Sequence, residues 1–139
     1  MKNSKKLFLI FLSVLIVAFV SCKKDSGGSI TTPTPTFKLS SLEGTWEEIK
    51  EKKETFTVSA QGAISGTIDG QTANFNIDSW DNTKEVTQLT TTHKNTSGST
   101  GDIDFTFIFE NANSCKVEVK GSQGTTSKNF TKKATATTK

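Results

Sequence analysis

The chain has 139 residues, with 17 lysines, 14 acidic residues and no arginine. This length suits one folded domain and not two. Three of the lysines lie within the first six residues, so the rest of the chain carries 14 side chains of each sign and is close to neutral. A neutral chain without arginine lacks both the basic surface and the bidentate contacts with which proteins hold nucleic acid, so nucleic acid is excluded as a partner.

Residues 1–21 predict a signal peptide. Three lysines and no acid precede an apolar stretch over residues 7–20 that is interrupted only by Ser13. A basic start followed by an apolar run is typical of a secretory signal. A transmembrane helix needs about 20 apolar residues, so this stretch is better explained as a cleaved segment than as a membrane span.

The end of the stretch, Phe19-Val20-Ser21-Cys22, resembles the lipobox of bacterial lipoproteins, in which a small residue precedes an obligatory cysteine. The resemblance implies cleavage between Ser21 and Cys22, and lipidation of Cys22 with a diacylglycerol on sulfur and a third chain on the amine. Each buried methylene adds about 0.8 kcal/mol of membrane affinity, so two or more chains make a durable anchor. We expect the protein in the outer membrane, facing the periplasm or the cell surface. The alternatives are an ordinary signal peptide that ends near a cysteine, or an uncleaved anchor.

Residues 22–36 are predicted to be the lipidated cysteine and a tether. The sequence from residue 23, KKDSGGSITTPTPT, has almost no large apolar side chain and cannot bury enough surface to fold. A folded domain is expected over residues 37–133, and a disordered tail over 134–139. Once Cys22 carries lipid, Cys115 has no disulfide partner, so we interpret it as a buried free thiol in the apolar row Cys115, Val117 and Val119.

The pattern of the domain is alternation with a period of two. It is clearest where Ile103, Phe105, Phe107 and Phe109 alternate with polar residues. Strands are predicted over residues 45–52, 55–60, 63–69, 72–78, 85–92, 103–110, 115–120 and 128–132. Turn signals separate them, and Asp69-Gly70 is the most specific, because a type I′ hairpin turn needs positive φ at both central residues. The pattern predicts an all-β antiparallel up-and-down meander of about eight strands that closes into a barrel; a two-sheet sandwich fits the same pattern.

Two polar stretches allow other interpretations. The run from Glu47 to Glu54, EEIKEKKE, has charge pairs at helical spacing, so a short helix is an alternative to the first strand. The run from Thr92 to Gly101, THKNTSGSTG, is rich in glycine and serine and is predicted to be a mobile loop.

The sequence Leu42-Glu43-Gly44-Thr45-Trp46 at the start of the domain resembles the Gly-x-Trp opening of the lipocalin fold. Together with the lipobox, the tether and the final Phe130-Thr131-Lys132-Lys133, it is similar to small lipocalin-like lipoproteins. The resemblance implies that the tryptophan closes one end of the barrel. Lipocalins usually pack an arginine from the last strand across this ring; here Lys132 is the candidate for that position.

No catalytic, metal-binding or cofactor-binding constellation is recognisable, so the protein is predicted not to be an enzyme. His93 is the only histidine and is interpreted as a surface residue. Asp102 and Asp104 share one strand face and could seat a calcium ion or an acid–base pair, but a solvated outer face is the better interpretation. The same holds for the glutamates of residues 47–54.

The expected function is that of a monomeric, lipid-anchored, lipocalin-like module that binds a small apolar ligand. The expectation is based on a row of inward aromatic side chains, as small-molecule pockets are often lined. The candidate ligand-binding residues are Trp46, Phe56, Phe75, Phe105, Phe107 and Phe109. The alternative is a structural protein of the envelope that presents its threonine-rich face or the 92–101 segment to a protein or glycan.

Overall fold

The computed structural model describes residues 33–97 and 101–134. The expected signal peptide, Cys22, most of the tether and the tail beyond residue 134 lie outside the described residues. Eight strands form one antiparallel sheet. They are β2 (Gly44–Glu48), β3 (Thr55–Val58), β4 (Ala63–Ile68), β5 (Gln71–Asn76), β7 (Leu89–Ser97), β8 (Gly101–Asn111), β9 (Ser114–Gly121) and β10 (Gly124–Lys132).

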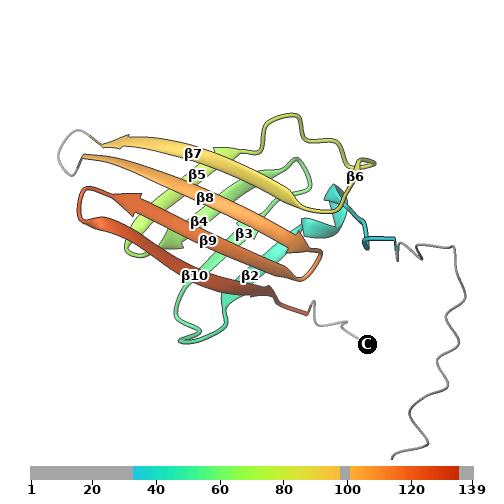
Figure 1. Ribbon diagram of the computed structural model, residues 1–139, viewed down its shortest axis with the longest axis horizontal. Helices are drawn as coiled ribbons and strands as arrows, with labels where there is room; N and C mark the ends of the chain where they lie inside the picture. The colour runs from blue at the N-terminus through green and yellow to red at the C-terminus, as the bar shows by residue number, and fades with distance from the viewer. Residues whose placement is uncertain (1–32, 98–100, 135–139) are drawn as a thin grey trace, which may run out of the picture. The chain divides into compact units, whose positions relative to one another are not determined.

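The sheet is an up-and-down meander that curls into a nearly closed barrel (Figure 1). Its strand order is β5-β4-β3-β2-β10-β9-β8-β7, so hairpin neighbours pair throughout and the first long strand pairs with the last. Only β5 and β7, the two edges, lack a backbone partner on one side. The predicted all-β antiparallel barrel of eight strands is confirmed, and the two-sheet sandwich is wrong.

Side chains bridge the seam between β5 and β7. The rings of Phe75 and His93 stack with centroids 4.5 Å apart and planes 4° apart. Beside them, Asn95 Nδ2 donates to the carbonyl oxygen of Thr72 at 3.4 Å. A ring stack and one amide contact thus join β5 and β7, the two edge strands, between which the described residues form no backbone ladder.

The predicted loop over residues 92–101 is wrong for most of its length. Residues 92–97 belong to β7, which pairs with β8 in continuous register from Leu89↔Phe109 to Ser97↔Gly101. His93 is half-buried, opposite Phe105, and is not a loop residue. The polar composition indicated a loop although the segment is a strand, because β7 forms an edge of the sheet, where inward positions can be polar. Residues 98–100 lie outside the described part.

One end of the barrel is covered by the residues that precede β2. The two-residue strand β1 (Phe37–Lys38) pairs with β6 (Glu85–Val86), and the 3₁₀ helix η2 (Leu39–Leu42) follows. Leu39 and Leu42 are fully buried, and Trp46 Nε1 donates to the carbonyl oxygen of Leu42 at 3.0 Å. This segment closes the end of the barrel at which β2 begins.

The hairpin turns test two sequence predictions. Asp69 and Gly70 have φ of 55° and 72°, which confirms the type I′ turn between β4 and β5. The segment after Glu48 is neither the predicted strand nor the alternative helix, because β2 ends at Glu48 and residues 49–52 turn back, with Lys52 at φ 55°. Six successive polar or charged positions, 50–55, offer no apolar row with which either element could pack.

The interior is filled mainly by aromatic rings. Phe56 lies at the centre, 5.8 Å from Trp46, 5.1 Å from Phe107 and 5.1 Å from Phe130 between ring centroids. Most of these pairs meet edge to face, an arrangement that aromatic rings favour. The predicted apolar row of β9 is confirmed: Cys115, Val117 and Val119 are buried, and burial raises the pKa of the Cys115 thiol. This thiol is therefore protonated and unreactive at neutral pH.

Gly66 of β4 faces Phe56 so closely that we expect even a methyl group there to be damaging. A Cβ built at Gly66 would lie 2.6 Å from the Phe56 Cβ and 2.6 Å from the Thr55 carbonyl oxygen. Gly66→Ala should lower the free energy of unfolding by about 1–3 kcal/mol, because backbone must shift. Gly121→Ala is the matched control, since nothing lies within 4 Å of its Cβ position. Equal urea midpoints for the two variants would contradict this packing.

Candidate ligand site at the barrel mouth

Five of the six predicted ligand-binding residues are packed in the core. Trp46, Phe56, Phe105, Phe107 and Phe109 are each 0–1% exposed and contact one another. The sixth, Phe75, is half-buried at the seam and contacts Phe107 with ring centroids 5.6 Å apart. The structure brings the six residues together in one cluster, and the cluster occupies the interior that a barrel ligand would need. Their role in binding stays a prediction.

Above this cluster, at the end of the barrel opposite η2, lies an open hollow of about 650 Å³. Hairpin turns of distant parts of the chain surround it, at the end where β4 meets β5 and β9 meets β10 (Figure 1). Ile103 and Val119, 5% and 7% exposed, supply its apolar lining. Asp69, Gln71 and residues 121–126 supply its polar lining. The lining therefore consists mainly of carboxylate, amide, hydroxyl and backbone groups, with Ile103 and Val119 as its apolar part.

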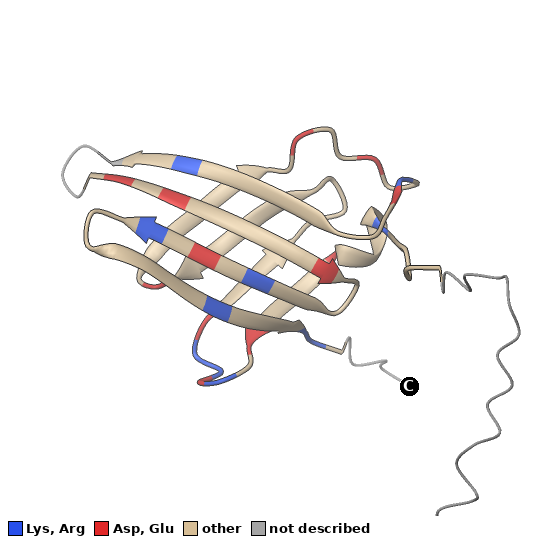
Figure 2. Cartoon of the chain, in the orientation of Figure 1, with Lys and Arg blue, Asp and Glu red and all other residues tan. Residues whose placement is uncertain are grey.

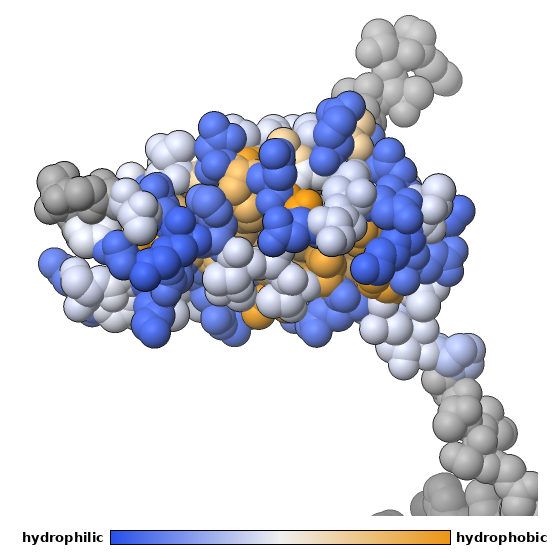
Figure 3. All heavy atoms as spheres, turned by 90° about the horizontal axis from the view of Figure 1, so that it is seen from above, coloured by the Kyte–Doolittle hydropathy of each residue, from blue (hydrophilic) through white to orange (hydrophobic). Residues whose placement is uncertain are grey.

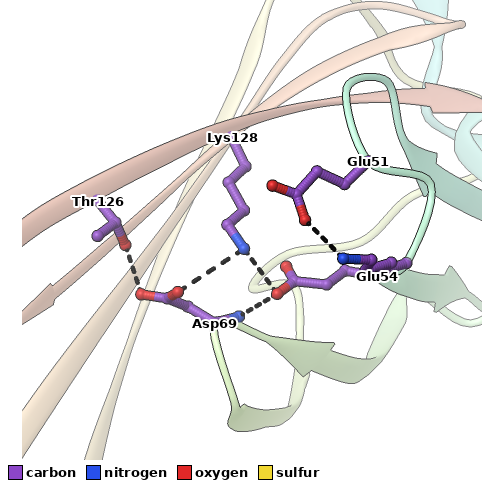
Figure 4. Close-up of polar contacts among 6 residues, drawn as sticks. Glu51, Glu54, Asp69, Thr126 and Lys128 are labelled. Atoms are coloured by element: carbon purple, nitrogen blue, oxygen red, sulfur yellow. Dashed lines mark hydrogen bonds and ion pairs between the residues drawn. The ribbon is translucent and has the colours of Figure 1, made fainter.

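A charged cluster borders this hollow (Figure 4). Lys128 of β10 places its ammonium 2.6 Å from Glu54 Oε1 and 3.7 Å from Asp69 Oδ1. The backbone N–H of Asp69 donates to Glu54 Oε1 at 3.0 Å, and Thr126 Oγ1 donates to Asp69 Oδ2 at 2.8 Å. Asp69 and Thr126 also line the hollow, so the cluster and the hollow share a wall.

The alternation of the strands explains this placement. Lys128 lies on the same face of β10 as Phe130, and Glu54 precedes Phe56 by two positions, so both side chains point into the barrel mouth. The same rule places Glu48 two positions beyond Trp46, on the inner face of β2. Glu48 is the only buried charged residue of the described chain, at 5% exposed.

Negative charge dominates the cluster. The hydrogen bond from Lys128 to Glu54 raises the pKa of this lysine, and the charges of Glu54, Glu48 and Asp69 act in the same direction. Lys128 therefore stays an ammonium at neutral pH. We name Glu48, Glu54, Asp69, Thr126 and Lys128 the mouth cluster.

The sequence interpretation missed the mouth cluster. The neighbouring lysines predict a solvated face for Glu48 and Glu54, and for these two residues that prediction is wrong. The available signal was the alternation itself, which continues inward from Trp46 to Glu48 and from Phe56 back to Glu54. Lys128 continues the row of Phe130 in the same way.

The other polar candidates lie outside the mouth. Asp102 is exposed and pairs with Lys94, Oδ2 to Nζ at 2.6 Å, on the outer face. Within residues 33–97 and 101–134, no three His, Cys, Asp or Glu side chains are grouped so as to hold a metal ion. Positive and negative residues alternate along β9, whereas β8 carries only acidic residues and β10 only lysines (Figure 2). Lys132 Nζ donates to the Ser41 carbonyl oxygen at 2.7 Å, tying the last strand to η2.

A second surface of interest is the seam of the barrel. Seen from above the view of Figure 1, hydrophobic surface is visible between hydrophilic side chains (Figure 3). Phe75 of β5, Leu89 of β7 and Val86 of β6 are only partly buried against the core. The edges of β5 and β7 thus expose both unpaired backbone and apolar side chains.

Comparison with known proteins gives no relative: no family model, no curated protein and no solved structure matches this chain. Among the described residues, no helix is of the length and hydrophobicity that crossing a bilayer requires.

Proposed function

We propose that this chain is a lipid-anchored, lipocalin-like binding protein of the bacterial outer envelope that holds a small, largely apolar ligand in the barrel mouth. The observation that carries the proposal is the open hollow of about 650 Å³ above the aromatic core. Small-molecule sites commonly combine a concave apolar wall with a few polar groups. Here Ile103 and Val119 offer the wall, and Asp69, Gln71 and Thr126 offer the polar groups.

The aromatic core supports a site at the mouth in preference to one deep in the barrel. Since Trp46, Phe56 and Phe107 are essentially unexposed, a ligand inside would have to displace packed rings. A ligand at the mouth needs no such displacement, and it could rest against Ile103 and Val119 at the upper edge of the core.

Native mass spectrometry tests the ligand directly. The chain from residue 23, exported to the periplasm behind an ordinary signal peptide, contains every described element and needs no detergent. We expect a native mass above the denatured mass by one small molecule. A bare protein that also shows no change in melting temperature with a broad library of apolar compounds would contradict the proposal. In the full-length chain, the denatured mass should begin at Cys22 and include the acyl chains.

A second candidate function is an interaction module without a small ligand. The specific observation in its favour is the pair of sheet edges, β5 and β7, with Phe75 and Leu89 partly exposed. Exposed strand edges are where other chains add to a sheet. In that case, the native mass would equal the denatured mass, and cross-linking on intact envelopes would join the tethered chain to a specific protein.

A further inference from the structure

We propose that the barrel mouth selects a ligand with a protonated amine beside its apolar body. The inference deepens the function proposed above and depends on it. It concerns which chemical group the mouth cluster recognises, and the geometry of that cluster is the reason for choosing a cation.

The mouth cluster holds more negative than positive charge. The ammonium of Lys128 lies 2.6 Å from Glu54 Oε1 and 3.7 Å from Asp69 Oδ1, and the negative charge of Glu48 also acts on it. Thr126 donates a hydrogen bond but brings no charge. If the cluster served only to neutralise Lys128, one carboxylate would suffice. The two additional negative charges favour a second cation at the same place.

One buried acceptor of the cluster also lacks a donor. Glu54 Oε1 receives both Lys128 and the Asp69 N–H, whereas Glu54 Oε2 is buried and has no hydrogen-bond partner in the part of the chain that the structure describes. Glu48 is 95% buried on the inner face of β2, and no hydrogen bond or ion pair joins its carboxylate to another described residue. A buried carboxylate oxygen without a donor, such as Glu54 Oε2, costs free energy. A ligand ammonium, with three N–H groups, could supply the missing donor.

The rest of the ligand has a defined place. Asp69 and Thr126 belong to both the mouth cluster and the lining of the hollow, so an amine at the cluster leaves its apolar body beside Ile103 and Val119. This places charge and hydrocarbon in the arrangement of a single-headed amphiphile. Lys128 remains paired with Glu54, and the three carboxylates together repel an anionic head group more than this one lysine attracts it.

Three probes of equal chain length separate the charge from the hydrocarbon. Binding of decylamine, decanoate and decanol to the chain from residue 23 is measured by calorimetry at neutral pH. We expect decylamine to bind at least about tenfold more tightly than decanoate or decanol, as charge-assisted hydrogen bonds require. In Glu48→Gln and Glu54→Gln, the ratio of the affinity for decylamine to the affinity for decanol should fall by about three- to tenfold. The control is Glu118→Gln, whose carboxylate pairs with Lys116 on the outer face of β9.

Each outcome decides between the two proposals. If none of the probes binds and the native mass shows no ligand, the proposed function itself fails. If all three bind with similar affinity, or decanoate binds best, the mouth is a binding site but its selection of a cation is refuted. A preference for decylamine that survives in both folded glutamine variants would also overturn the assignment, because the selecting charge would then lie elsewhere.

Discussion

Replacing Phe56 with alanine is expected to destabilise the barrel by about 3–5 kcal/mol, the largest effect of any single substitution considered for this chain. The ring is 1% exposed and contacts Trp46, Phe107, Phe109 and Phe130. Its removal would leave a cavity between four rings that cannot close by moving one side chain. A typical domain has only about 5–15 kcal/mol of stability in total. For a domain at the lower end of that range, the loss expected here is enough to unfold part of the protein at ambient temperature.

Urea unfolding of the chain from residue 23, followed by tryptophan fluorescence, measures this effect through the buried Trp46. The control is Ile49→Ala in the turn after β2, where the side chain is 53% exposed. That substitution should change the unfolding free energy by no more than about 0.5 kcal/mol. If Phe56→Ala cost less than about 1 kcal/mol, the interior could not be the tightly filled aromatic core described above.

The aromatic core could be predicted from the sequence because its members alternate. On β8, Ile103, Phe105, Phe107 and Phe109 occupy every second position, and a period of two admits only one face for all of them. The same rule identified β3, β5 and β9, and the type I′ turn at Asp69-Gly70 set the register of one hairpin. Where apolar residues mark the inner face, local pattern and three-dimensional position agree.

The polar positions of the inner face could not be recognised in this way. His93 and Asn95 face inward on β7, and Glu48 faces inward on β2, yet their composition suggested a loop and a solvated face. His93 and Asn95 are tolerated at the seam because Phe75 stacks on the imidazole and the Thr72 carbonyl oxygen accepts from the amide. Glu48 lies at the mouth, where the charge of Lys128 acts on it. Only the closed topology determines where the seam and the mouth lie.

The candidate site depends on contacts that are distant in sequence. Lys128 and Glu54 are 74 positions apart, and Thr126 and Asp69 are 57 apart. No local pattern connects these pairs, because their proximity follows from the pairing of β10 with β2 and the resulting curl of the sheet. The strands with an apolar inner row were therefore predictable from the sequence, whereas most of β7 and the site required the barrel.

Removing the ammonium of Lys128 should be the most damaging change at the mouth. Exposed ion pairs contribute about 0–1 kcal/mol, and loss of one partner from a buried pair costs about 3–5 kcal/mol. The side chains of Lys128 and Glu54 are 24% and 19% exposed, between these limits, so we expect Lys128→Met to cost about 1–3 kcal/mol at neutral pH. The variant removes the cation that offsets the negative charges of Glu48, Glu54 and Asp69. Urea unfolding measures the cost.

The pH dependence of this loss follows from the raised pKa of Lys128, for which the hydrogen bond to Glu54 is the main cause. A lysine whose pKa is higher in the folded state stabilises the protein fully below its unfolded value, 10.5, and loses that contribution as the pH rises through the higher folded value. The difference in unfolding free energy between wild type and Lys128→Met should therefore be constant from about pH 7 to 9, and it should become smaller only above about pH 10.5.

The control for this prediction is Lys116→Met. Lys116 and Glu118 form an equally short ion pair, at 2.7 Å, but their side chains are 39% and 35% exposed on the outer face of β9. That pair should contribute less than about 1 kcal/mol. Equal unfolding free energies for the two methionine variants would mean that Lys128 does not balance the carboxylates of the mouth. The same would follow if the difference in unfolding free energy between wild type and Lys128→Met already became smaller between pH 7 and 9. The cation selection inferred for this site would then lose its electrostatic basis, since it depends on the same excess of negative charge.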